Sequence, residues 1–184
     1  MPDPTVLRIA TRNSPLAQIQ AHWVGHKLMA QHPQLNYVLV PIITEADTHE
    51  KSLSTQGGKG VFVKAIQKAV LEGRADLTVH SAKDMPSIDT PGLTLCCVPE
   101  RGPCHDVLAT MDAHDTLATL PAGARIGTSS PRRAFLIEQY HPTLKVLPIR
   151  GNIQTRLDRL KTQQFDGLIL AAAGLMRLSI SANI

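Results

Sequence analysis

Short basic loops that carry glycine or serine are the parts of this sequence best suited to chemistry. Five of them, residues 10–15, 57–60, 80–86, 127–133 and 149–156, fall where a predicted strand gives way to a helix. Backbone N–H groups at helix N-termini favour anions, and arginine binds carboxylates through paired hydrogen bonds. One conspicuous acid, Asp84, lies among these cations. Converging in one cleft, such loops would hold a ligand with several negative charges, which indicates an enzyme acting on a polycarboxylate.

The second half of the chain places four arginines at such junctions: Arg132, Arg133, Arg150 and Arg156. Ser129 or Ser130 is predicted to cap the helix that follows, and Pro131 fits its first turn. Taken alone, the first two arginines equally fit a well-capped surface helix with solvated side chains. The repeated arrangement after the next strand favours a carboxylate clamp.

Asp84 follows Lys83 just past a predicted strand whose Leu77 and Val79 should be buried. A capping or turn role is the simpler interpretation of an aspartate at such a place. Among several cations, however, its carboxylate should stay ionised, which suits it to stabilise a positive intermediate and to accept a hydrogen bond from an N–H group. A hydrolase triad has no support, because no nucleophile elbow is present.

Metal and thiol chemistry have little support in the sequence. His22 and His26 have the i, i+4 spacing of metal ligands, but with no third ligand in view two solvated histidines are the favoured interpretation, and we predict no metal site. Cys96, Cys97 and Cys104 are odd in number and lack ligand spacing, so we expect buried or incidental thiols and no disulfide framework.

Composition limits the class of protein. With 184 residues, 43% of them hydrophobic, the chain is long enough for a core in one domain or two small ones. The formal charge of +4 is compatible with nucleic acid, but aromatic residues make up 3% and long basic runs are missing, which favours a small anion. No leader-like or membrane-spanning apolar segment is found, so we expect a cytoplasmic protein without nucleic-acid or membrane partners.

Strand and helix patterns alternate along the chain. Strands are predicted at 6–10, 37–43, 75–80, 93–98, 106–110, 125–128, 145–149 and 167–171. Helices are predicted at 15–31, from 61 to about 72, from 130, at 152–160 and at the end of the chain. Residues 44–56 show no periodicity and are predicted to form a lid. The pattern predicts an α/β fold with mostly parallel sheets flanked by helices.

Three stretches make the chain resemble the porphobilinogen deaminase family, also called hydroxymethylbilane synthase. They are LRIATRNSPLA from Leu7, VHSAKDMP from Val79 and LPAGARIGTSSPRR from Leu120. The resemblance runs along nearly the whole chain. It implies a transferase of heme and tetrapyrrole biosynthesis that deaminates porphobilinogen and joins four molecules into hydroxymethylbilane on a covalently bound dipyrromethane cofactor.

The resemblance also implies roles for individual residues. Asp84 would be the catalytic carboxylate, and Lys59 would belong to the lid. Residues matching the family's substrate-binding positions are Arg12, Ser14, Arg150 and Arg156. Residues matching its cofactor-binding positions are Lys83, Thr128, Ser129, Ser130, Arg132 and Arg133.

The implied architecture is that of type II periplasmic binding proteins, with two domains and the active site in the cleft between them. Here the domains would be 1–100, with lid loop 44–58, and 101–184, and the full-length protein would be a monomer. The family continues with a segment returning to the first domain and a third domain that carries the cofactor cysteine. None of the three cysteines here matches that attachment loop, so we expect no covalent dipyrromethane and no turnover by this chain alone.

Departures from the family pattern leave other interpretations open. Glu45 and Thr55 remove positive charge from the lid, and Pro131 replaces the family's usual leucine. The alternatives are a non-catalytic module that keeps an anion-binding cleft like that of a periplasmic binding protein, and a truncated paralogue with neither role. The sequence does not separate a cut chain from a natural short one.

Overall fold

The computed structural model describes residues 5–43 and 61–180. The chain divides into two compact units, Met1–Pro99 and Glu100–Ile184. Each unit contains its own sheet with helices packed against it. The predicted lid, 44–58, and Lys59 lie outside the described residues.

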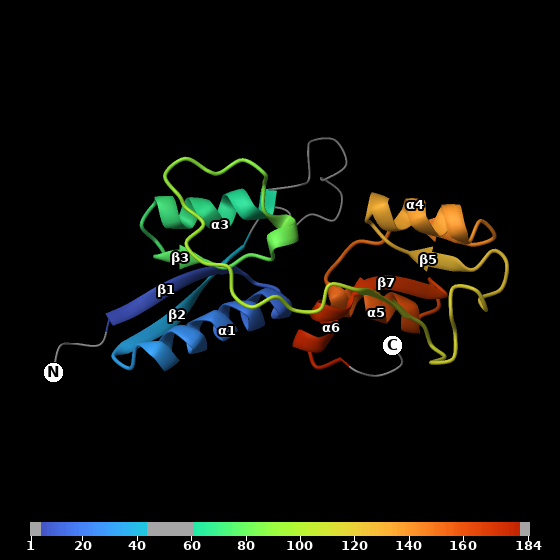
Figure 1. Ribbon diagram of the computed structural model, residues 1–184, viewed down its shortest axis with the longest axis horizontal. Helices are drawn as coiled ribbons and strands as arrows, with labels where there is room; N and C mark the ends of the chain where they lie inside the picture. Colours follow the sequence, from blue (N-terminus) through green and yellow to red (C-terminus); the bar gives the residue numbers. More distant parts are fainter. Residues whose placement is uncertain (1–4, 44–60, 181–184) are drawn as a thin grey trace. The chain divides into compact units, whose positions relative to one another are not determined.

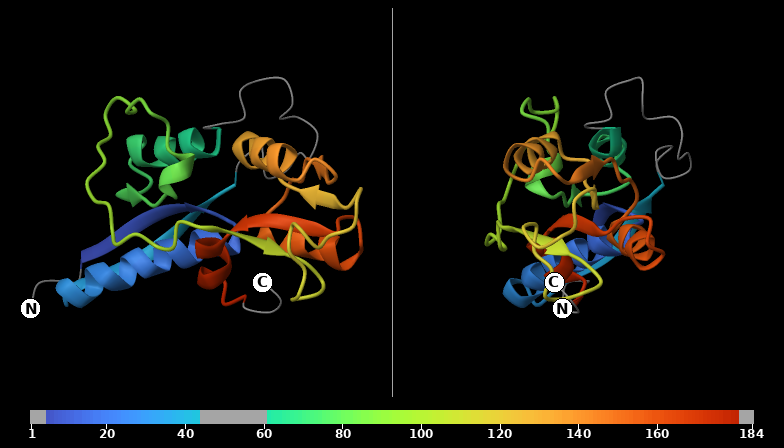
Figure 2. Two further views of the ribbon diagram at one scale, coloured as in Figure 1. Left: turned by 45° about the vertical axis from the view of Figure 1, so that its right-hand side comes forward. Right: turned by 90° about the vertical axis from the view of Figure 1, so that its right-hand side faces the viewer.

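A three-stranded parallel sheet forms the first unit, with strand order β2-β1-β3. Its elements are β1 (Thr5–Arg12), α1 (Pro15–Gln31), β2 (Leu35–Ile42), α3 (Val61–Leu71) and β3 (Leu77–Thr78). A short 3₁₀ turn, η2 (Ala82–Asp84), follows the last strand. Helices α1 and α3 lie on opposite faces of this sheet (Figures 1 and 2).

Side chains of β1 point alternately to the two faces of the sheet and form the core of the first unit on both. Ala10 points to the α3 face, where it packs with Ile66, Ala69 and Ala75. On α1, Ala21 is fully buried, and Ala17, Val24 and Leu28, which share its helix face, are half-buried. Gly73 follows α3 with a φ of 68°, the left-handed conformation in which glycine commonly ends a helix.

A four-stranded sheet of order β4-β7-β5-β6 forms the second unit. Its elements are β4 (Asp106–Ala109), β5 (Arg125–Gly127), α4 (Pro131–Tyr140), β6 (Lys145–Leu147), α5 (Ile153–Lys161), β7 (Gly167–Ala171) and α6 (Ala172–Arg177). Strand β5 runs parallel to both β6 and β7, whereas β4 pairs with β7 in the antiparallel sense.

Alternate side chains of β7 supply the two faces of this sheet. Leu168 and Leu170 pack with Leu160 of α5 and Leu175 of α6, whereas Ile169 packs on the other face with Ile137 of α4. Figure 1 shows the same layers, with α4 on one side of the sheet and α5 and α6 on the other. The predicted α/β class with mostly parallel strands and flanking helices is therefore confirmed.

Four details of the sequence prediction were wrong. Strand β3 spans two residues rather than the predicted six. Residues 93–98 form no strand, because no described strand pairs with them. Cys96, Cys97 and Cys104 are exposed free thiols rather than buried ones, since two of them lie in this unpaired segment. Leu77 and Val79 are half-buried because few residues cover so short a strand.

Candidate functional site

The carboxyl ends of β1 and β3 bring the predicted site residues of the first unit together. These strands are parallel neighbours, with Ala10 opposite Thr78, so the loops that follow them emerge at one edge of the sheet. Arg12 is the last residue of β1 and its side chain is half-buried. Ser14 caps α1, accepting a hydrogen bond from the Ala17 N–H at 3.4 Å.

Asp84 lies at the end of the η2 turn, and its side chain is exposed, as is that of Lys83. The Asp84 N–H donates to the Ser81 carbonyl at 2.9 Å, which closes the turn. The Ser81 hydroxyl in turn donates to the Gln20 side chain of α1 at 3.1 Å. This contact spans 61 residues, so no local pattern of the sequence predicted it.

His80 lies between β3 and this turn and is more enclosed than Asp84. Burial lowers the pKa of His80, and the negative charge of Asp84 opposes that shift. One ring nitrogen, Nε2, lies 3.0 Å from the Thr78 hydroxyl. Sequence reasoning missed His80, which lies close enough to Asp84 to be influenced by its charge.

In the second unit the candidate residues follow β5 and β6, which are also parallel neighbours. Thr128 is buried, and its hydroxyl accepts the Ser130 N–H at 3.2 Å. The Ser129 hydroxyl donates to the Ile149 carbonyl, which ties the loop after β5 to the loop after β6. Arg132 and Arg150 are exposed.

Ser130 occupies the N-cap of α4, as predicted, but its side chain makes no capping hydrogen bond. Its backbone N–H donates to the Thr128 hydroxyl, and the neighbouring Ser129 hydroxyl donates to the Ile149 carbonyl. By contrast, Asn152 caps α5 by accepting from the Thr155 N–H at 2.9 Å. The first turn of α4 therefore has N–H groups that its cap residue does not satisfy.

Arg133 is bound within its own unit. Its Nε donates to Asp106 at 2.8 Å, a second nitrogen donates to the other carboxylate oxygen at 2.5 Å, and a third donates to the Ile169 carbonyl at 3.2 Å. This fork fastens α4 to β4 and β7. Sequence reasoning missed Asp106, which lies 27 residues away in the chain.

Arg156, on the first turn of α5, lies in a positively charged setting. Burial lowers the pKa of its guanidinium, and the positive charges of Arg133 and Arg159 lower that pKa further. Its Nε donates to the Gly151 carbonyl at 2.9 Å, a neutral partner. Such a cluster is most stable when an anion neutralises it.

The described residues contain no group of three or more histidine, cysteine, aspartate or glutamate side chains that could hold a metal ion. Within the same described part, no helix has the length and apolar character needed to cross a membrane.

Comparison with known proteins identifies the family of this chain. Residues 7–184 match the family model described as "Porphobilinogen deaminase, dipyromethane cofactor binding domain". A porphobilinogen deaminase of Syntrophotalea carbinolica is 47% identical over 181 residues, covering 98% of this chain and 57% of the relative. The chain thus spans a little over half the length of this curated relative.

Two solved structures show weaker similarity. The periplasmic VFT2 domain of BvgS from Bordetella pertussis is 15% identical, with a TM-score of 0.47 over 92% of this chain and 68% of that one. Substrate-binding domain 2 of GlnP from Lactococcus lactis is 13% identical, with a TM-score of 0.44 over 93% of this chain and 70% of that one. The family match covers nearly the whole sequence, and the chain therefore belongs to the porphobilinogen deaminase family.

Proposed function

We propose that this chain supplies the catalytic carboxylate and the anion-binding loops of a porphobilinogen deaminase. The full-length enzyme would deaminate porphobilinogen and join four molecules into hydroxymethylbilane, in the cytoplasm and as a monomer. Family membership supports the reaction, since the curated relative carries that name. The division into domains 1–100 and 101–184 is part of the same proposal.

The observation that carries the proposal is the positive charge gathered around Arg156. Burial and two nearby positive charges lower the pKa of the Arg156 guanidinium, whose Nε donates to a neutral carbonyl, so a substrate carboxylate beside it is favourable, and porphobilinogen brings an acetate and a propionate. Arg150 and Arg156 flank the same turn, and we assign them to the substrate carboxylates. Arg12 and Ser14 take the same role at the edge of the first unit.

Dipyrromethane fits the loop after β5. The N-terminal N–H groups of α4 lack a side-chain cap, and Arg132 lies in the same turn, so a cofactor carboxylate has donors there. When bound, the cofactor supplies the pyrrole to which the growing chain is joined. The residues that would hold it are Lys83, Thr128, Ser129, Ser130, Arg132 and Arg133. Three N–H donors of Arg133 are already bonded to Asp106 and Ile169.

Asp84 is assigned to the chemistry rather than to binding. Its exposed carboxylate, held by the η2 turn, accepts a pyrrole N–H and stabilises the positive charge that develops as ammonia leaves. Tested alone, this chain should not turn over porphobilinogen, because none of its cysteines matches the loop to which the family attaches its cofactor.

The proposal is tested by calorimetry with porphobilinogen on the chain itself. A charge-assisted hydrogen bond contributes about 1.5–3 kcal/mol, so Arg156→Gln should weaken porphobilinogen binding roughly tenfold or more, and Arg132→Ala should do the same to the binding of a dipyrromethane. Added salt should weaken binding in the parent protein. Lys161→Gln is the matched control, because Lys161 lies on the same helix and is exposed at its far end. Equal affinity in Arg156→Gln and Lys161→Gln would disprove the clamp.

A further inference from the structure

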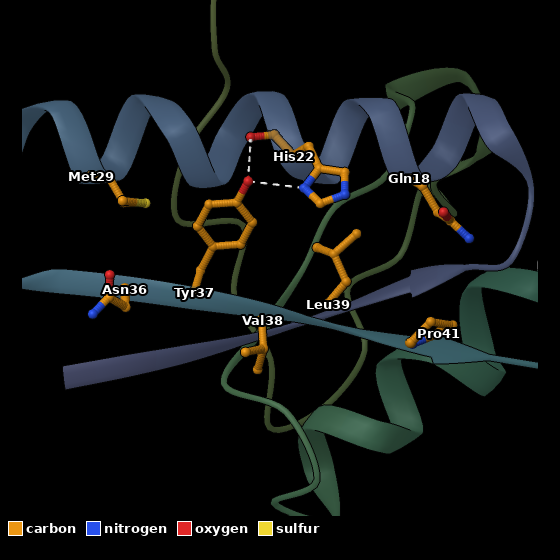
Figure 3. Close-up of a pocket in the computed structure, with 8 residues that line it drawn as sticks. All are labelled: Gln18, His22, Met29, Asn36, Tyr37, Val38, Leu39 and Pro41. Atoms are coloured by element: carbon orange, nitrogen blue, oxygen red, sulfur yellow. Dashed lines mark hydrogen bonds between the residues drawn. The ribbon is translucent and has the colours of Figure 1, made fainter. Parts of the chain in front are cut away.

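A cluster of two histidines and a tyrosine joins α1 to the edge strand β2, away from every residue assigned above. His22 and His26 lie one helical turn apart on α1, with ring centroids 6.1 Å apart. The Tyr37 ring of β2 meets both edge-on, with centroid distances of 5.8 and 5.6 Å. Figure 3 shows His22 and Tyr37 facing each other between α1 and β2. Both line a pocket of about 570 Å³.

Tyr37 controls which ring nitrogen of His22 is available. Its hydroxyl lies 2.9 Å from His22 Nδ1 and within 3.5 Å of the His22 backbone carbonyl. When the phenol donates to that carbonyl, its oxygen is left to accept a hydrogen bond from the Nδ1–H group. Nε2 then carries the lone pair, the arrangement found in histidines that bind metals with a hydrogen-bonded second nitrogen.

The two rings are nearly close enough to share one ion. With metal–nitrogen bonds of about 2.0–2.1 Å, two imidazoles side by side on one ion have centroids roughly 4.5–5.3 Å apart. The observed separation of 6.1 Å must therefore shorten by about 1 Å. The ring planes here are 23° apart, so a rotation of the exposed His26 side chain is needed for its lone pair to converge with that of His22. Both histidines are exposed, which leaves room for that rotation and for water ligands.

The backbone is shaped around this cluster. A Cβ atom on Gly25 would lie 2.7 Å from the Tyr37 ring, closer than real Cβ atoms approach other groups. Glycine at this buried position lets the Tyr37 ring pack against the helix, where it contacts both histidines. Met29 lines the same hollow one turn further along α1.

We propose that His22 and His26 form a binding site for one late first-row divalent transition-metal ion, with water completing the coordination and Tyr37 orienting His22. Imidazole ligands suit copper, nickel and zinc, and the expected order of affinity is Cu²⁺ above Ni²⁺ and Zn²⁺. Because Tyr37 belongs to β2, the bound ion also braces α1 against the edge of the sheet.

Nickel titration of the purified chain tests the site. Calorimetry with NiCl₂ should show one equivalent bound to the parent, and the melting temperature should rise with nickel concentration. His26→Gln should weaken nickel binding at least tenfold and abolish the rise in melting temperature. Tyr37→Phe keeps the ring and removes the hydroxyl, so it should weaken binding by a smaller factor.

The matched control is His114→Gln, which removes an exposed histidine of the other unit and should leave nickel binding unchanged. His26→Gln lies at an exposed position, and its melting temperature without metal should equal that of the parent. Equal nickel affinity in His26→Gln and the parent would overturn the proposal, as would a failure of the parent to bind nickel. Neither outcome bears on porphobilinogen binding.

Discussion

The two units repeat one arrangement of strands and helices. In the first unit the chain runs β1, α1, β2, α3, β3, with β1 in the middle of the sheet. In the second it runs β5, α4, β6, α5, β7, with β5 in the middle of these three strands. All four of these strand pairs are parallel. The difference is β4, which adds an antiparallel edge to the second sheet.

The same arginine–aspartate contact closes both repeats. Arg8 donates to both carboxylate oxygens of Asp76, and its backbone N–H bonds to that carboxylate at 2.7 Å. Arg125 and Asp166 do the same, again with a backbone contact of 2.7 Å. Each arginine also reaches the carbonyl three residues before its aspartate, at Gly73 or Gln163, where φ is positive.

The two units share this framework, but the loops at the carboxyl ends of their strands differ. After β3 the first unit has Lys83 and Asp84, whereas the positions at the same distance after Asp166 are Ala173 and Gly174. In the second unit the charged loop follows β6 instead, with Arg150 and Arg156. The comparison teaches that the repeat preserves the contacts that stabilise each sheet, while reactive groups are added loop by loop.

Substitution of Asp84 should have the largest effect on activity, because Asp84 is the acid that the second repeat lacks. In the full-length enzyme, Asp84→Asn should reduce single-turnover ammonia release by at least about a hundredfold, since a positioned charge is lost at the transition state. Substrate affinity and melting temperature should barely change. Asp89→Asn, an exposed neutralisation nearby, is the control. Near-normal ammonia release by folded Asp84→Asn would end its catalytic assignment.

Removing either arginine–aspartate contact should have a moderate effect on stability. Arg8→Met and Arg125→Met each leave a carboxylate with its backbone donor but without the guanidinium, so both should lower the melting temperature by a few degrees. Differential scanning calorimetry measures the two losses. Comparable losses would sharpen the view that the contact is a repeated framework element. A loss confined to one unit would break the comparison.

Acid should weaken both repeats through the same contact. Hydrogen bonds from Arg8 and Arg125 lower the pKa of Asp76 and Asp166 below the ordinary aspartate value of about 3.9. A folded-state pKa below the unfolded one contributes stability above the unfolded value, and that contribution is lost as pH falls through the folded pKa. Urea unfolding between pH 6 and pH 3 should show a smaller acid-induced loss in Asp76→Asn and Asp166→Asn than in the parent.

The sequence predicted the helices and most strands because their signals are local. Ser14 and Pro15 fix the start of α1, and the continuous apolar run at 167–171 marks a buried strand. The segment 93–98 has the same kind of sequence but no described partner, and strand formation depends on pairing that a single segment does not contain. The repeat itself was not recognised, since its two copies share a few positions spread over long intervals.

The candidate site was predicted as a set of residue types at strand ends, and the parallel sheets do group those residues. What the sequence did not reveal are contacts between distant residues. Two examples are the contact of Arg133 with Asp106 and that of Ser81 with Gln20. Both depend on how elements pack, and no short stretch of sequence predicts either. That the Ser130 side chain makes no capping hydrogen bond to α4 was likewise not predicted.

Helix caps give the smallest expected effect, and they separate two Ser-Pro starts that look alike in the sequence. Ser14→Ala removes a long capping bond and should cost about 0.5 kcal/mol, and Asn152→Ala should cost about 1 kcal/mol because its amide oxygen also accepts from the Thr155 hydroxyl. Ser130→Ala removes no capping bond, so its free energy of unfolding should stay within about 0.5 kcal/mol of the parent. Urea titration measures all three variants. A loss in Ser130→Ala as large as that in Asn152→Ala would show that this hydroxyl caps α4 in solution, and would remove the argument that a cofactor carboxylate binds at that helix end.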